Sequence, residues 1–367
     1  MHILLTADTV GGVWTYTHEL VTGLLRRGHR VTLVSFGGHP TPEQMQWMKG
    51  LESLAYFPTA YRLEWMQESV NDIEQSFEWL DRLIQQVEPD LLHFNQYAYG
   101  ALPTHIPKIV VAHSDVVSWW VNTREEDPHE TSWLRWYRGL VSNGLSGANA
   151  VVAPSEWMLN ALKTYYISPA ESHVIHNGRD AALFDHSVPK EKCVVTVGRL
   201  WDEAKQVSLV VEHNHSVPLY VAGSVEHPES LGARTAKYYG QGGVTWLGSQ
   251  SWQQLRDLYA KAAVYAGTSR YEPFGLAPVE AALSGCALLL NDIPTFHELW
   301  GDAACYFDRN NSESLAAKIR MLIDNPEERQ QFAARAMERA STAFSTDRML
   351  DSYERAYSSL VKQEAYA

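Results

Sequence analysis

Residues 264–290 read VYAGTSRYEPFGLAPVEAALSGCALLL: an apolar run, a loop, a helical pattern and a second apolar run. The runs Val264–Ala266 and Ala287–Leu290 are continuously apolar, which indicates strands of a parallel sheet that is covered by helices on both faces. The loop opens a helix whose free backbone amides would face the carboxyl end of that sheet and favour an anion. Such a strand–helix–strand unit is typical of α/β folds.

The same alternation runs along the whole chain. In the first half, apolar runs separated by helical stretches lie at His2–Thr6, Val31–Phe36, Leu91–Phe94, Ile109–Ala112 and Ala150–Ala153. A second series precedes the quoted segment at Val194–Gly198, Leu219–Gly223 and Val244–Trp246. The pattern predicts two Rossmann-like α/β halves, and 367 residues is a suitable length for two domains.

The expected domain limits follow from the polar segment Asp185–Lys192, which carries a proline and has no periodic apolar pattern. We therefore expect an N-terminal domain over 1–186 and a C-terminal domain over 187–345. The remaining residues, 346–367, are expected to form a helix that packs back toward the N-terminal domain. Asn325-Pro326 predicts a break between two helices shortly before it.

Composition excludes several classes of protein. With 45% hydrophobic and 20% charged residues the chain can bury a core, and a net charge of −13 makes nucleic acid a poor partner. No run of about 18 apolar residues occurs, and the N-terminus lacks the charged start of a signal peptide, so stable membrane insertion is not expected. Cys193, Cys286 and Cys305 are far apart, which favours a reduced, cytoplasmic compartment. Weak membrane association stays open.

Two carboxylates in the quoted segment are candidate ligand contacts. Glu272 lies in the loop and Glu280 about one turn into the helix, so both can point at one bound molecule. Carboxylate oxygens accept hydrogen bonds from hydroxyls, which suits a sugar and a ribose. The alternative is that Glu272 compensates the helix dipole and Glu280 is solvated.

Cations and glycines follow the first strand of each half. Arg199 and Lys205 come after Val194–Gly198, and they would converge on the same crevice and bind a diphosphate, Arg199 bidentately. Gly11 and Gly12 follow His2–Thr6 and could let a backbone approach a phosphate, although a tight turn also needs glycine. Their spacing is not the GxGxxG of a dinucleotide fold.

Several motifs together carry a resemblance to a known family: Gly11-Gly12, Ala112-His113-Ser114-Asp115, Ala153-Pro154-Ser155-Glu156, Val174-Ile175-His176-Asn177-Gly178, Gly198-Arg199-Leu200 with Lys205, Ala222-Gly223, Leu247-Gly248, Glu272-Pro273-Phe274-Gly275-Leu276 and Glu280. On these residues, over nearly its whole length, the chain is similar to the family-four retaining glycosyltransferases of the GT-B fold. The resemblance implies two Rossmann-like domains facing each other across a deep cleft, the first binding an acceptor and the second a nucleotide-sugar donor.

The resemblance also implies roles for single residues. Glu280 resembles the residue that binds the ribose, Glu272 the one that holds the sugar hydroxyls, and Arg199 with Lys205 the pair that stabilises the departing diphosphate. His113 matches a histidine that contacts the donor sugar, unless it is a structural residue ending a strand. The other implied donor contacts are Gly11, Gly12, Leu247, Pro273, Phe274, Gly275 and Leu276.

The motif departs from the family pattern in one place, because Gln206 stands where a glycine commonly follows the lysine. An Asp-x-Asp pair for a divalent metal is absent from the sequence, which agrees with the family's metal-independent chemistry. We expect no metal site and no cofactor besides the nucleotide-sugar co-substrate.

The acceptor side is less informative. Trp119 and Trp120, expected in a loop after His113, are candidates to stack on a saccharide. Glu125-Glu126-Asp127-Pro128-His129 is more readily a solvated acidic loop than a metal cluster. Overall we expect a retaining, metal-independent hexosyltransferase of carbohydrate biosynthesis with a UDP-sugar such as UDP-glucose as first donor, GDP-mannose as second, and a hydroxyl of a saccharide or other small molecule as acceptor. The alternatives are a sugar-nucleotide 2-epimerase and a non-catalytic nucleotide-sugar-binding protein.

Overall fold

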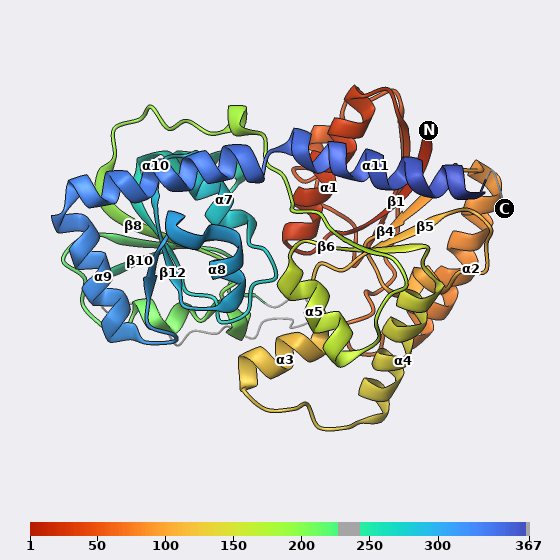
Figure 1. Cartoon of the computed structure of the whole chain (residues 1–367), viewed down its shortest axis with the longest axis horizontal. Coiled ribbons are helices and arrows are strands. Elements are labelled where there is room, and N and C mark those ends of the chain that lie inside the picture. Colours follow the sequence, from red (N-terminus) through yellow and green to blue (C-terminus); the bar gives the residue numbers. More distant parts are fainter. Residues whose placement is uncertain (227–242, 365–367) are drawn as a thin grey trace. The chain divides into compact units, whose positions relative to one another are not determined.

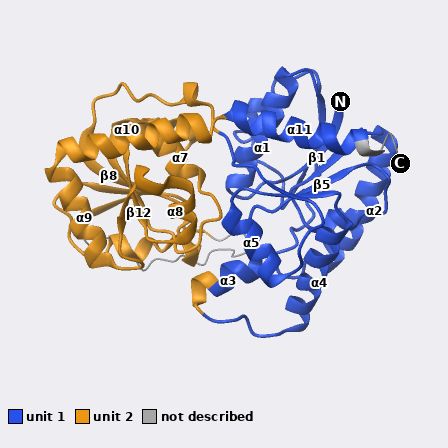
Figure 2. Cartoon of the chain, in the orientation of Figure 1, with its two compact units in different colours: residues 1–121, 126–178, 346–367 blue, residues 122–125, 179–345 orange. Residues whose placement is uncertain are grey.

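The computed structural model describes residues 1–226 and 243–364 of the chain (Figure 1). It contains two compact units, coloured separately in Figure 2. Unit 1 consists of Met1–Val121, Glu126–Gly178 and Thr346–Ala367. Unit 2 consists of Asn122–Glu125 and Arg179–Ser345.

Unit 1 is built on a seven-stranded parallel sheet in the order β3-β2-β1-β4-β5-β6-β7. Helices pack against its faces, and successive residues of β1 point to opposite sides, since Leu4 belongs to one apolar cluster and Ile3 and Leu5 to the other. The strands are β1 (His2–Asp8), β2 (Arg30–Phe36), β3 (Leu54–Pro58), β4 (Leu91–Phe94), β5 (Lys108–Val111), β6 (Ala150–Ala153) and β7 (Ser172–Val174). The helices are α1 (Gly12–Arg26), α2 (Val70–Val87), α3 (Val116–Arg124), α4 (Ser132–Gly147), α5 (Glu156–Tyr165) and α11 (Thr346–Glu364).

Unit 2 repeats this plan with a six-stranded parallel sheet in the order β10-β9-β8-β11-β12-β13. Counted from its own first strand, the order is 3-2-1-4-5-6, as in the doubly wound nucleotide-binding fold. The strands are β8 (Glu191–Val197), β9 (Leu219–Ala222), β10 (Val244–Gly248), β11 (Ala262–Gly267), β12 (Ala287–Asn291) and β13 (Cys305–Phe307). The helices are α6 (Trp252–Lys261), α7 (Leu276–Leu283), α8 (Pro294–Trp300), α9 (Ser312–Asp324) and α10 (Pro326–Ala343).

Local sequence signals place the helix ends. The Ser155 side chain accepts a hydrogen bond from the Met158 amide at the start of α5. Ser251 and Gln254 form a capping box at the start of α6. The break expected at Asn325-Pro326 is confirmed, because α9 ends at Asp324 and α10 begins at Pro326.

The last helix returns to the first unit. In α11 the buried side chains Met349, Leu350, Tyr353, Tyr357 and Leu360 face the apolar cluster that contains α1. The helices approach closely at Gly23, where an added Cβ would lie 2.4 Å from Leu350 Cδ1. Figure 1 shows α11 lying alongside α1.

All ten predicted strands are present, with small shifts at their ends. β3, β7 and β13 were not predicted; they are edge strands of three to five residues with half-buried or alternating faces. The chain leaves unit 1 at Gly178, eight residues before the expected domain limit at 186, and residues 346–367 belong to unit 1. The segment between β9 and β10 lies outside the described residues over 227–242.

Candidate active site

The candidate residues of unit 2 gather at one edge of its sheet. The strand order reverses direction between β8 and β11, and ligands of such sheets bind outside the carboxyl ends of the strands at that point. Arg199 and Lys205 follow β8, whereas Glu272 and Glu280 follow β11. The fold therefore brings two cations and two carboxylates from distant parts of the chain to the same edge.

Lys205 and Glu272 form a direct ion pair. The Lys205 ammonium lies 2.5 Å from Glu272 Oε2, and the two side chains are 18% and 15% exposed. Ser269 donates a second hydrogen bond to the same oxygen at 3.0 Å. The Lys205 backbone is fixed as well, because its carbonyl accepts from the Thr268 hydroxyl at 2.7 Å. The charges of these two predicted ligand contacts therefore offset each other.

Arg199 is the more exposed cation of the set, with 40% of its side chain accessible. Its guanidinium donates to Asp202 Oδ2 at 2.8 Å and lies 5.1 Å from the centre of the Trp201 ring. Asp202 is 5% exposed and also accepts from the Ala204 amide. These contacts hold the arginine at the loop after β8 while leaving part of its donor fork accessible.

Glu280 is buried and not solvated. Its Oε1 lies 3.1 Å from Nε of Arg179, and the two side chains are 9% and 1% exposed. The Arg179 guanidinium in turn lies 4.5 Å from the ring centre of Trp252 and 5.4 Å from that of Phe184. A buried carboxylate in this position needs its cation, since removal of either partner leaves an uncompensated charge.

Gly275 shapes the entry to α7. Its φ of +89° suits glycine, and an added Cβ would lie 3.0 Å from Glu272 Cγ. Leu276 begins the helix, so the predicted amides of Phe274, Gly275 and Leu276 surround its N-terminus, with Pro273 just before them. The Phe274 ring is anchored against Phe344 at 5.3 Å.

The loop that carries Arg199 packs closely against a second glycine, Gly223. Gly223 has φ +149°, and a Cβ there would lie 1.7 Å from the carbonyl oxygen of Gly198. The Leu200 amide donates to the Ser224 carbonyl at 2.8 Å, and the Gly223 amide to Gly248 at 2.8 Å. Leu247 lies next to Gly248 at the end of β10, so this predicted donor contact also lies at the carboxyl edge of the sheet.

The backbone conformation at Gln206 explains why a glycine commonly follows the lysine in the family. Its backbone is left-handed, with φ 45° and ψ 41°, between the short 3₁₀ turns Glu203–Lys205 and Val207–Val210. Its side chain is 9% exposed, and Oε1 has no hydrogen-bond partner in the described part of the chain. A glycine would adopt this backbone without strain, whereas Gln206 pays a conformational cost.

Unit 1 places its own candidates at the corresponding edge. Gly11 has φ 80° and precedes α1, whose first residue is Gly12, so the α1 amides open at the carboxyl end of β1. Asp8, the last residue of β1, accepts from the Val10 amide at 2.6 Å and fixes this turn. β1 is paired with β4, which makes this edge the reversal point of the unit 1 sheet.

His113 follows β5 at the same edge. One ring nitrogen, Nε2, lies 2.8 Å from Oδ1 of Asn95, and the Tyr16 ring packs edge-on at 4.6 Å. Burial lowers the pKa of His113 to about 3, so the imidazole is neutral near pH 7. Asp115 has a structural role two residues later, because it accepts from the Ser118 amide in the first turn of α3.

The predicted loop around Trp119 and Trp120 is wrong, because both residues lie in α3. Val116, Val117 and Ser118 extend from the Asp115 cap as a helix, which overrides the β-branched residues in this stretch. The two indole rings contact each other edge-on at 6.4 Å. Whether they bind an acceptor stays a prediction.

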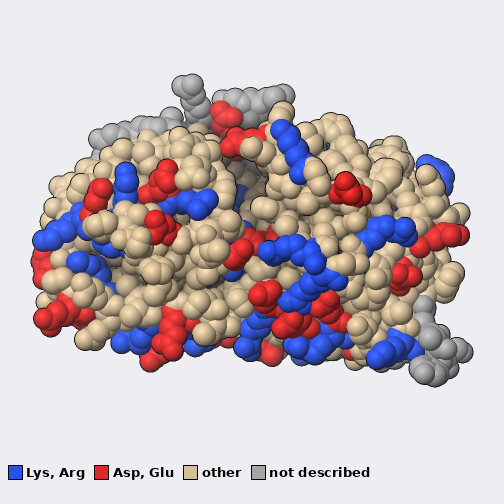
Figure 3. Space-filling view, turned by 90° about the horizontal axis from the view of Figure 1, so that it is seen from above, with Lys and Arg blue, Asp and Glu red and all other residues tan. Residues whose placement is uncertain are grey.

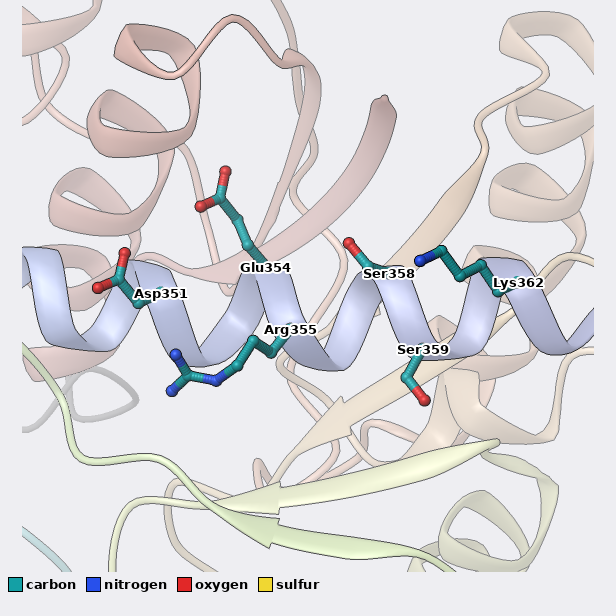
Figure 4. A pocket seen from close by; sticks show the side chains of 6 residues that line it. All are labelled: Asp351, Glu354, Arg355, Ser358, Ser359 and Lys362. Atoms are coloured by element: carbon teal, nitrogen blue, oxygen red, sulfur yellow. The ribbon is translucent and has the colours of Figure 1, made fainter.

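The surface gives further limits. Figure 3 shows a face on which acidic and basic side chains are interspersed. A surface groove in Figure 4 is lined entirely by α11, and two of its residues, Asp351 and Glu354, already pair with Arg27 at 2.7 and 2.6 Å.

Within residues 1–226 and 243–364, no group of three His, Cys, Asp or Glu residues could hold a metal ion. In the same ranges, no helix is long and apolar enough to cross a membrane.

Some contacts of the site were not anticipated from the sequence. Arg179 directly follows the motif at Val174–Gly178, and a charged residue at that point was a usable signal. Asp202 stands three residues after Arg199, a spacing that permits a local ion pair. Asn95 directly follows the apolar run Leu91–Phe94. Polar residues that follow a strand in this way lie at the carboxyl edge of the sheet, where ligands of such folds bind.

Comparison with known families accounts for both units. The family model described as Glycosyltransferase Family 4 matches residues 10–183, and that described as Glycosyl transferases group 1 matches residues 179–339. The chain belongs to the family-four glycosyltransferases, retaining enzymes that use nucleotide-sugar donors and are typically independent of metal ions. The family expected from the sequence motifs is confirmed.

Individual relatives are distant. The chain is 25% identical to the O-antigen chain mannosyltransferase RfbU of Salmonella typhimurium over 52% of its own length, and it spans only 56% of that protein. It is 24% identical to the alpha-maltose-1-phosphate synthase of Mycolicibacterium smegmatis over 69% of its length and 72% of that protein.

Solved structures confirm the GT-B fold. Sucrose-phosphate synthase of Thermosynechococcus elongatus matches with a TM-score of 0.80 at 17% identity, over 99% of this chain and 100% of that one. HepE of Anabaena, solved with UDP and glucose, matches with a TM-score of 0.74 at 18% identity, over 98% and 100%.

Proposed function

We propose that this chain transfers a hexose from a UDP-sugar to a hydroxyl of a saccharide or other small acceptor, with retention of anomeric configuration. The observation that carries the proposal is the set of two cations and two carboxylates at the reversal point of the unit 2 sheet. Such a set can bind a diphosphate and hydroxyl groups in one molecule.

The donor would divide these groups by charge. Arg199 and Lys205 take the diphosphate together with the amides at the start of α7, while Glu272 and Glu280 accept from sugar and ribose hydroxyls. Donor binding would replace the ion pair of Lys205 and Glu272 with contacts from each side chain to the donor. Because the Lys205 ammonium would then contact the diphosphate and the Glu272 carboxylate the sugar hydroxyls, neither charge is left buried without a polar contact.

The charge that develops during transfer determines the roles. As the glycosidic bond loosens, negative charge grows on the leaving phosphate, and Arg199, Lys205 and the α7 amides stabilise it. The leaving phosphate assists deprotonation of the acceptor hydroxyl on the same face of the sugar. Gly12 and His113 of unit 1 would contact the phosphate and the donor sugar.

UDP-glucose is the first donor choice and GDP-mannose the second. The first is supported by the UDP and glucose bound to HepE. The second is supported by the mannosyltransferase named among the relatives. Trp119 and Trp120 remain the acceptor candidates, because aromatic rings suit a sugar face.

Thermal shift in EDTA is the first test. We expect one of UDP, GDP, ADP and dTDP to raise the melting temperature, because a ligand of the native state stabilises it. Glu280→Gln should reduce that shift at least several-fold, since a neutral amide is a weaker acceptor for ribose hydroxyls. The matched control is Glu212→Gln, which neutralises an exposed carboxylate of unit 2 and should leave the shift intact.

Turnover separates the remaining alternatives. NMR of the binding nucleotide's sugar, incubated with a panel of saccharides, should show a new glycoside with the donor's anomeric configuration. A donor epimerised without any acceptor would instead establish a 2-epimerase, and binding without turnover a binding protein. If no nucleotide binds in EDTA and all bind weakly and equally with Mg²⁺, the donor site is wrongly assigned.

A further inference from the structure

A connected set of buried polar side chains leads from His113 to the last helix. Oδ1 of Asn95 lies 2.8 Å from Nε2 of His113 and 3.3 Å from Nε2 of His93. Nδ1 of His93 lies 2.6 Å from the hydroxyl of Tyr357 in α11. His93 and Tyr357 are fully buried, and the proposed transfer mechanism assigns them no role.

The amide of Asn95 has a fixed orientation. Its Nδ2 donates to the Thr6 carbonyl at 2.6 Å, and its backbone amide donates to the Thr6 hydroxyl at 3.0 Å. A flipped amide would place two acceptor oxygens 2.6 Å apart, which is unfavourable. Oδ1 therefore faces both histidines and can only accept, so each histidine must present an N–H.

The surroundings of His93 require the same tautomer. Its Nε2 also lies 3.3 Å from the Tyr16 oxygen, whose proton is donated to Tyr353 at 2.7 Å. Nε2 thus faces two acceptors and carries the proton, so Nδ1 is left as an acceptor for the Tyr357 hydroxyl. Burial lowers the pKa of His93 to about 3, which keeps the ring neutral.

The proton of His113 is placed on Nε2 in the same way. With its proton on Nε2, its Nδ1 is a lone-pair acceptor, and Nδ1 has no hydrogen-bond partner in the described part of the chain. We propose that Asn95, supported through His93 by Tyr357 of α11, is a positioning residue that holds His113 in the Nε2–H tautomer and offers Nδ1 to a hydroxyl of the donor sugar. This inference rests on the proposed function.

The arrangement has a consequence for specificity. Nδ1 of neutral His113 can accept but not donate, so it recognises a sugar O–H and disfavours an analogue that lacks it. A donor deoxygenated at the contacted carbon should lose about tenfold in kcat/KM with the wild-type enzyme, as expected for one missing hydrogen bond. The same donor should lose little with an Asn95→Ala enzyme, in which the acceptor is no longer held in place.

The tautomer can be read without any substrate. In ¹⁵N-histidine NMR of the full chain, with His113→Gln used for assignment, we expect wild-type His113 as the neutral Nε2–H form at pH 7. Asn95→Ala should give a mixture of the two neutral tautomers of His113. Tyr357→Phe should lower the share of the Nε2–H tautomer of His93, because Nδ1 loses its hydrogen-bond donor. Tyr99→Phe is the matched control, because it removes another buried hydroxyl of unit 1, which donates to Ser76 rather than to the histidine network, and it should leave His113 unchanged.

The kinetic measurement uses the same variants. Asn95→Ala should lower kcat/KM about tenfold, and circular dichroism should establish that the variant is folded. An Nδ1–H tautomer in the wild type, or an unchanged tautomer and kcat/KM in Asn95→Ala, would overturn the proposal. If the wild type transfers no sugar from any donor, the proposed function fails, and the tautomer assignment is still decided by NMR.

Discussion

Gln206, at the carboxyl edge of the unit 2 sheet, combines two unfavourable local features. Gln206 adopts a left-handed backbone directly after Lys205, and its buried Oε1 lacks a partner among the described residues. Both features cost stability, the first through steric conflict of the Cβ and the second through lost hydration. The position therefore combines two local penalties beside a proposed diphosphate contact.

Gln206→Gly should stabilise unit 2 by about 1 kcal/mol, because glycine accepts φ 45° and no amide is buried. The expected rise in melting temperature is about 2–4 °C. Gln206→Ala is the control, since it removes the amide but keeps the Cβ and should gain less. Equal melting temperatures for the Gly and Ala variants would show that the backbone is not strained.

His93 should make stability depend on pH. Its pKa falls from 6.5 in the unfolded chain to about 3 when folded, so between these values the unfolded chain binds the extra proton and stability decreases as pH falls. Glu64 acts in the opposite sense, because burial raises its folded pKa to about 7 and the folded state binds the extra proton between pH 4.5 and 7. The wild-type curve alone would mix these effects.

Comparison with His93→Gln isolates the histidine. We expect the difference in unfolding free energy between wild type and this variant to fall by about 1.4 kcal/mol for each pH unit as the pH is lowered from 6 to 4. Urea unfolding at several pH values measures it. A difference independent of pH would mean that His93 titrates alike in the folded and unfolded chain.

The sequence could predict residue types at this scale better than their partners. Glu272, Glu280, Arg199 and Lys205 were recognisable because they recur at fixed places in a motif. The ion pair of Glu280 with Arg179 was not, since Arg179 is 101 positions away along the chain and only the folded sheet brings them together. The same holds for Asn95 beside His113.

Among the elements, central strands were predictable and edge strands were not. A strand buried on both faces, such as β11, needs a continuous apolar run that is visible in sequence. An edge strand is short and partly exposed to solvent, so the three residues of β7 show no continuous apolar run. Trp119 and Trp120 show the converse error, because the helix around them is fixed by its Asp115 cap rather than by its composition.

The loops after β8 and β9 support each other through glycine. Gly223→Ala should destabilise unit 2 by about 2 kcal/mol and weaken nucleotide binding, because the new Cβ would displace the Gly198 carbonyl next to Arg199. Denaturant unfolding and thermal shift with nucleotide measure the two effects. Gly243→Ala is the control, since Gly243 also has positive φ but open space around its Cβ position. An equal loss of unfolding free energy in both variants would mean that the positive φ alone, and not the contact with the Gly198 carbonyl, causes the destabilisation.

At the scale of the whole molecule, unit 1 is discontinuous along the chain. Its α11 supplies six buried side chains to the cluster shared with α1, and Leu350 fills the space above Gly23. Leu350→Ala should therefore destabilise unit 1 by about 2–5 kcal/mol. The control Ser359→Ala changes an exposed residue of the same helix and should have almost no effect. Similar melting temperatures for the two variants would contradict the packing role of α11.

The return of the chain to unit 1 also sets an order of events during protein synthesis. Residues 179–345 of unit 2 leave the ribosome after residues 126–178 of unit 1 and before its last segment, 346–367. At ordinary translation rates this interval lasts on the order of ten seconds, during which unit 2 can fold as a nearly continuous segment. The apolar surface that α11 later covers stays open for that time, so unit 1 becomes complete only after unit 2 has been made.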